Sequence, residues 1–131
     1  MVLKLLGRAP LSYYEQQDQW KTPGSFQNFD GKTFNGVTFR CQFWLPRDEN
    51  FPLEKLFAAI RSELQHGRFV IVSLAVPSVG WHNWVIYDED LNGEFLAVSK
   101  WKAKTVTIRD VRAQITNMKG TDIGTYELQA L

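Results

Sequence analysis

The stretch that most limits the fold of this chain is residues 68–76, "RFVIVSLAV". After Arg68 only Ser73 interrupts a run of apolar, largely β-branched and aliphatic side chains. A run of this kind is typical of a strand that is covered on both faces. We therefore expect a sheet around this strand, with other segments packed on each side of it.

The segment just before that run, "NFPLEKLFAAIRSELQHG" (residues 50–67), has helical periodicity. Asn50 is expected to cap the helix, Pro52 suits its first turn, and Gly67 is a typical C-terminal stop. Apolar side chains recur at steps of three and four residues and predict one buried stripe: Leu53, Leu56, Phe57, Ile60 and Leu64. The pattern predicts the main helix at about residues 51–66.

The rest of the regular structure is predicted to be mostly β. Residues 37–45 alternate apolar and polar side chains, and "HNWVIYDE" is expected to pair with "EFLAVS" across the turn at Asn92-Gly93. "KTVTI" (104–108) continues the meander, a short helix is expected at about 110–118, and "IGTYELQAL" is a last strand. The class is α+β, with a mostly antiparallel sheet in a single domain spanning residues 1–131.

Composition narrows the range of functions. The net charge of +1 gives no overall field towards nucleic acid or membrane, and no apolar stretch reaches the length of a membrane span. The only cysteine, Cys41, has no partner for an internal disulfide, which favours a reducing compartment, the cytoplasm. The chain has no phosphate-loop, dinucleotide, CxxC or HExxH motif, so we predict no cofactor and no metal site.

His82 lies between two tryptophans at the start of the predicted hairpin. Strand alternation puts Trp84 on the same face as His82, and puts Trp81 and Asn83 on the opposite face. Two interpretations stay open. His82 is either a polar packing residue at a strand end or a general base at the rim of a cleft.

Residues 53–99 resemble the second half of a papain-like cysteine peptidase, nearest to the C39-like group. The matching residues are those of a helix, a strand and a histidine hairpin: Gly67, Arg68, Val70, Ile71, Val72, Gly80, Trp81 and His82. "LSYYEQQDQW" (11–20) resembles the segment that precedes the nucleophile in that group. The resemblance implies a thiolate–imidazolium pair with His82 as base. It also implies that Gln16, Gln17 or Gln19 donates to the oxyanion, and that an Asn or Asp orients the ring.

The chain departs from this pattern at two places. Where the nucleophile is expected it has Ser25 and turn-forming residues instead of a cysteine, while Cys41 is on the apolar face of a strand. The strand "EFLAVSK" ends in Ser99 and Lys100 where the family usually ends in the orienting Asn or Asp. The first hypothesis is therefore a catalytically degenerate domain that binds a peptide, a partner protein or a small molecule in the relict cleft, through Trp81, Asn83, Trp84 and Ser99. The alternative is an active hydrolase that uses Cys41, His82 and Gln19.

A third hypothesis comes from "KWKAKTVTIRDVR" (100–112), which is rich in cations: Lys100, Lys102, Lys104, Arg109 and Arg112. The three lysines are two residues apart and are expected to project from one strand face. A solvated edge strand explains such a run, and so does a surface that binds nucleic acid or an acidic partner.

Overall fold

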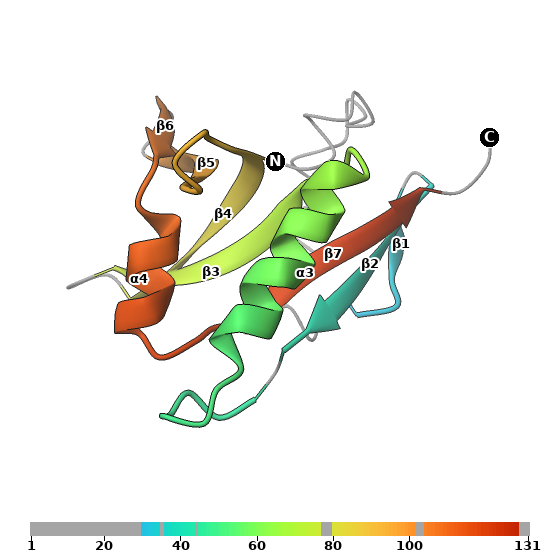
Figure 1. Ribbon diagram of the computed structural model, residues 1–131. Helices are drawn as coiled ribbons and strands as arrows, with labels where there is room; N and C mark the ends of the chain where they lie inside the picture. Colours follow the sequence, from blue (N-terminus) through green and yellow to red (C-terminus); the bar gives the residue numbers. More distant parts are fainter. Residues whose placement is uncertain (1–29, 35, 44, 77–79, 102–103, 129–131) are drawn as a thin grey trace.

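The computed structural model describes residues 30–34, 36–43, 45–76, 80–101 and 104–128. Its strands form one antiparallel sheet in the order β1-β2-β7-β3-β4-β5-β6. The strands are β1 (Thr33–Phe34), β2 (Val37–Gln42), β3 (Val70–Val76), β4 (Gly80–Glu89), β5 (Phe95–Trp101), β6 (Lys104–Ile108) and β7 (Ile123–Leu128). Two helices, α3 (Leu53–Gln65) and α4 (Val111–Asn117), complete the described elements, so the predicted α+β class is confirmed (Figure 1).

The last strand, β7, lies inside the sheet and not at its margin. It pairs antiparallel with β2 on one side and with β3 on the other, so that β2 and β3 run parallel with β7 between them. Helix α3 connects those two parallel strands across one face of the sheet (Figure 1). The chain therefore runs from the C-terminal end of β2 to the start of α3, and from the end of α3 to the start of β3.

The main core lies between this face and the two helices. The apolar stripe of α3 is buried as predicted, with Leu56, Phe57 and Ile60 at its centre and with Leu53 and Leu64 at its rims. Alternate residues of β3, β4 and β5 meet the stripe: Val70, Val72, Leu74, Trp84, Ile86, Phe95 and Ala97. Val111 and Ile115 of α4 belong to the same cluster. The helix-covered face is therefore the apolar side of the sheet.

The ends of α3 are only partly as expected. Gly67 has φ of 76°, its N–H donates to the Leu64 carbonyl, and the Arg68 N–H reaches the Glu63 carbonyl, which is the glycine-terminated end the sequence predicts. The expected cap is wrong. The N-cap residue is Pro52, which makes no side-chain cap hydrogen bond, while the Asn50 N–H donates to the Asp48 carboxylate.

The second face of the sheet, opposite the helices, is covered unevenly. On β2 and β7 it buries Val37, Phe39 and Tyr126, with the last two rings 6.2 Å apart. On β3, Ile71 and Ser73 are half-buried and Ala75 is exposed. The expectation that β3 is covered on both faces is thus wrong at Ala75, whose neighbour on the adjacent strand, Trp81, is itself exposed.

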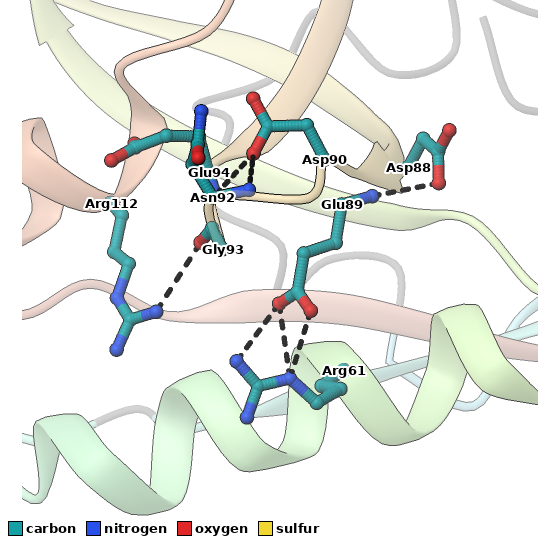
Figure 2. A network of polar contacts seen from close by, with 8 residues as sticks. All are labelled: Arg61, Asp88, Glu89, Asp90, Asn92, Gly93, Glu94 and Arg112. Carbon is teal, nitrogen blue, oxygen red and sulfur yellow. Dashed lines mark hydrogen bonds and ion pairs between the residues drawn. The ribbon is translucent and has the colours of Figure 1, made fainter.

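The β4–β5 hairpin is tied to α3 and α4 by charged and polar contacts (Figure 2). Arg61 of α3 donates from Nε to both carboxylate oxygens of Glu89, at 3.1 and 3.0 Å. The Asp90 carboxylate accepts the backbone N–H groups of Asn92 and Glu94 and so closes the predicted turn. Arg112 of α4 donates to the Gly93 carbonyl at 3.3 Å. These contacts hold β4, and the residues it carries, against the helical layer.

Candidate functional site

His82 lies near the start of β4, opposite Leu74 of β3, on the helix-covered face. Its Nε2 is 2.7 Å from the Ser99 hydroxyl oxygen, and that oxygen is 2.8 Å from the Asn83 carbonyl oxygen. A serine hydroxyl has one hydrogen, and only the hydroxyl can donate to the carbonyl. Ser99 therefore accepts from His82, which assigns the ring proton of the neutral imidazole to Nε2.

Burial changes the acid–base behaviour of this imidazole. His82 is half-buried, and loss of hydration lowers its pKa below the ordinary value of 6.5. The Trp84 ring meets it edge-on, with the ring centres 5.3 Å apart. At neutral pH the site thus favours an uncharged imidazole that is held in one orientation.

Two of the four predicted ligand-binding residues are inside the protein. Trp84 is 8% exposed and belongs to the core, and Ser99 is 7% exposed with its hydroxyl already engaged. The prediction that Trp84 shares a face with His82 is confirmed, because both pair with core residues of β3. Its low exposure, however, leaves it no surface on which a ligand ring could lie.

The other two, Trp81 and Asn83, lie on the second face and are exposed, as alternation predicted. Trp81 is 50% exposed, and the Arg47 guanidinium lies 4.4 Å from the centre of its ring. Asn83 accepts a hydrogen bond from Ser73 at 3.2 Å through its side-chain oxygen. Sequence reasoning missed Arg47, which comes from the loop after β2 and reaches β4 only through the fold.

Cys41 is far from His82 in the sheet. Cys41 pairs with Gly124, Gly124 with Ile71, and Ile71 with Val85, so β7 and β3 separate the two residues and alternation puts them on opposite faces. Three strand spacings alone amount to roughly 14 Å. The structure therefore does not bring the thiol within hydrogen-bond range of the imidazole.

The surroundings of Cys41 favour its neutral thiol. Burial, and after it the charge and hydrogen bonding of Asp122, raise the pKa of Cys41 to about 12. The thiol donates to the Asp122 carboxylate at 3.7 Å, and the pKa of Asp122 is itself raised by burial. A thiolate nucleophile needs nearby positive charge, and Cys41 has the opposite.

The cationic residues do not form one strand face. Lys100 is in β5 opposite Thr105, whereas Lys104 is in β6 opposite Trp101, so the two-residue spacing rule for a single strand does not apply to them. Lys104 and Arg109 are exposed, and Arg109 contacts Asp90 at 3.4 Å. The Arg112 guanidinium stacks 4.8 Å from the centre of the Phe57 ring.

Several predicted residues lie outside the described part of the chain, namely Gln16, Gln17, Gln19, Ser25 and Lys102. Within the described residues, no group of three or more His, Cys, Asp or Glu is placed to hold a metal ion. No helix in that same part of the chain is long and apolar enough to cross a membrane.

With this geometry established, the chain was compared with known proteins. A scan against protein-family models, a search of curated proteins and a search of solved structures found no match.

Proposed function

We propose that this chain is a papain-like, C39-like domain that has lost its nucleophile and now binds a peptide or partner protein, with a small molecule as the alternative ligand. The binding surface lies at the start of β4, where Trp81 and Asn83 are exposed on the second face of the sheet. His82 lies between them in the strand, on the helix-covered face. The single cysteine favours a reducing compartment, and we propose the cytoplasm.

The observation that carries the loss of catalysis is the separation of Cys41 from His82. They lie on opposite faces with two strands between them, and the thiol has a pKa of about 12. Activation of a cysteine by a histidine needs direct contact and a thiolate. Neither condition is met by this pair.

One contact supports the papain-like part of the proposal. By the resemblance, Ser99 and Lys100 end the strand where the family usually has an Asn or Asp, and the Ser99 hydroxyl oxygen lies 2.7 Å from Nε2 of His82. This hydrogen bond supports the view that the end of β5 orients the imidazole, as the resemblance implies, even though Cys41 is out of reach.

The case for binding is made by Trp81. Large aromatic side chains with half of their surface in water are common anchors of binding surfaces, because covering them removes much apolar area at little entropic cost. Arg47 lies over the ring and adds a cation able to meet a carboxylate or carbonyl group of a ligand. Asn83 offers amide groups two residues along the same strand face.

The test is selection of ligands from a displayed library of random peptides by the folded wild-type chain. We expect enriched peptides whose binding falls at least roughly tenfold in Trp81→Ala, the usual loss at an anchor residue. Leu91→Ala is the matched control, because Leu91 is fully exposed in the β4–β5 turn at the other end of β4. It should bind like the wild type.

Two results would overturn the proposal. One is the absence of any enriched peptide and of any ligand among small aromatic probes followed by tryptophan fluorescence. The other is equal loss of binding in Trp81→Ala and Leu91→Ala, which would indicate non-specific adhesion of exposed apolar residues.

A further inference from the structure

Strand β6 ends the sheet. It pairs with β5 along its whole length, from Lys104 opposite Trp101 to Ile108 opposite Ala97, and among the described strands it has no second neighbour. Figure 1 shows it at the margin of the sheet, on the side away from β2. Its outer edge is therefore open to a strand from another molecule.

The register shows which backbone groups of β6 point away from β5. Trp101 and Lys104 close a two-residue connection, and such a closing pair exchanges hydrogen bonds with itself. Hydrogen-bonded and non-hydrogen-bonded pairs then alternate along an antiparallel ladder. The N–H and C=O groups of Thr105 and Thr107 are therefore directed outwards, and both side chains are exposed.

A second copy of β6 that runs antiparallel satisfies these groups with its own. When Val106 lies opposite Val106 of the second copy, Thr105 of each chain faces Thr107 of the other, and the outward N–H and C=O groups of both residues are used. A shift by two residues in either direction leaves one of the two threonines without a strand residue opposite it. The symmetric register thus makes the most hydrogen bonds, and it has the two-fold symmetry that is commonest for two identical chains.

The side chains at the centre of this register are apolar. Val106 and Ile108 lie on the helix-covered face, opposite Ser99 and Ala97 of β5, and both are half-buried against the core. The two copies of Val106 would form a non-hydrogen-bonded pair, the kind in which side chains lie closer together. Pairing therefore covers apolar surface that a single chain leaves in water.

The charges beside this edge are of both signs and favour a second copy as the partner. Lys104 is exposed at the start of the strand, and Asp110 is exposed two residues after its end. Asp110 accepts a hydrogen bond from the uncharged amide of Gln114, whereas the charge of Arg109 is balanced by Asp90 at 3.4 Å. An antiparallel partner strand should thus be acidic beside Lys104 and basic beside Asp110. The same segment of a second copy, turned round, has this order.

We propose that two copies of this chain pair through the outer edges of β6 and form one continuous antiparallel sheet. The backbone groups of Thr105 and Thr107 supply the hydrogen bonds, and Lys104 of each chain lies near Asp110 of the other. This edge is separate from Trp81, which lies on β4 with β5 between it and β6. The inference therefore does not depend on the proposed function.

The test is sedimentation equilibrium of the full chain over a range of micromolar to submillimolar concentrations, where we expect a reversible monomer–dimer equilibrium. Thr107→Pro removes an outward N–H without removing a bond to β5, at an edge position where proline is tolerated. It should weaken dimerisation at least roughly tenfold, since two symmetry-related hydrogen bonds are lost and the proline rings block the edge. Thr107→Val keeps the N–H and should dimerise like the wild type.

Exchanged charges test whether the partner is a second copy in this register. Lys104→Glu places a carboxylate near Asp110 of the other chain, and Asp110→Lys places an ammonium near Lys104, so each variant alone should dimerise roughly fivefold more weakly. An equimolar mixture of the two variants should recover the wild-type affinity, because every such contact in the mixed pair again joins opposite charges. A mixture that associates no more tightly than either variant alone overturns the proposal.

Hydrogen exchange of the wild type keeps the test decisive if Thr107→Pro does not fold. The Thr105 and Thr107 amides should exchange more slowly as the chain concentration rises, whereas the Val106 amide, which faces β5, should not change. A chain that stays monomeric at the highest concentration overturns the proposal. So does a dimer that leaves these two amides unprotected, or one that is lost in Trp81→Ala and kept in Thr107→Pro.

Discussion

His82 and Cys41 belong to different halves of the sheet, one on the helix-covered face of β4 and the other on the second face of β2. Both are half-buried ionisable groups, and burial acts on both. It lowers the pKa of the imidazole and raises that of the thiol, so that each is held in its neutral form. A thiolate–imidazolium pair requires both groups to be charged. The surroundings of His82 disfavour the imidazolium, and those of Cys41 disfavour the thiolate.

The difference between the two regions lies in their polar partners. The imidazole donates a hydrogen bond to Ser99, and the Ser99 hydroxyl donates one to the backbone carbonyl of Asn83. The thiol faces the carboxylate of Asp122, which repels a thiolate. Thus the surroundings of His82 fix its orientation, whereas those of Cys41 suppress its reactivity. Neither region supports nucleophilic chemistry by Cys41.

The largest effect we predict is on the alkylation rate of Cys41 by iodoacetamide. A pKa of about 12 instead of 9.0 leaves about a thousandfold less thiolate at neutral pH, so labelling should be correspondingly slow. Asp122→Asn removes the negative charge and should speed labelling, although burial keeps the thiol slower than an ordinary one.

The matched control for that substitution is Asp30→Asn, because Asp30 contributes least among the causes that raise the pKa of Cys41. Its effect should be smaller than that of Asp122→Asn, and His82→Ala should leave the rate unchanged. Fast labelling at low pH that disappears in His82→Ala would contradict this comparison and revive the hydrolase hypothesis.

The next effect concerns the fixed orientation of His82. Ser99→Ala removes the hydroxyl that accepts from His82 and donates to the Asn83 carbonyl, and should lower the free energy of unfolding by about 1–3 kcal/mol. Ser73→Ala is the control, because Ser73 also bonds to Asn83 but at an exposed oxygen. It should change the free energy of unfolding by less than about 0.5 kcal/mol.

Denaturant titration of both variants measures this difference. Equal destabilisation by the two substitutions would mean that the Ser99 hydroxyl contributes no more than an exposed serine. The hydrogen bond to Ser99 would then not be what stabilises this region.

Local patterns in the sequence predicted the elements well. The apolar stripe of α3, the Gly67 stop and the Asn92-Gly93 turn act over a few residues, and each lies where the sequence places it. Alternation also put Trp84 with His82 and Trp81 on the other face. These features depend on period and backbone conformation, which neighbouring residues determine.

Contacts between distant segments were not predictable in the same way. The insertion of β7 between β2 and β3 pairs Cys41 with Gly124. The contact of the Arg47 guanidinium with the Trp81 ring likewise joins segments that are far apart in the sequence. Nothing local distinguishes a central strand such as β7 from an edge strand of similar composition. For this reason the sequence suggested a possible pairing of Cys41 with His82, which strand order rules out for the described fold.

The smallest effect we predict is on the pH dependence of stability. Because the native pKa of His82 lies below its ordinary value of 6.5, the unfolded chain binds a proton there that the native chain does not. The free energy of unfolding should therefore fall as pH decreases through about 6.5 towards the native pKa, and should be unaffected by His82 above that window. His82→Gln should remove this part of the pH dependence. His66→Gln is the control, because the exposed His66 ring is bonded to the Ser62 carbonyl. It shows whether the effect belongs to His82 or follows from the loss of either histidine. A steeper loss of stability in His82→Gln than in the wild type over the same window would mean that His82 gains a proton on folding, and that its region favours the charged ring after all.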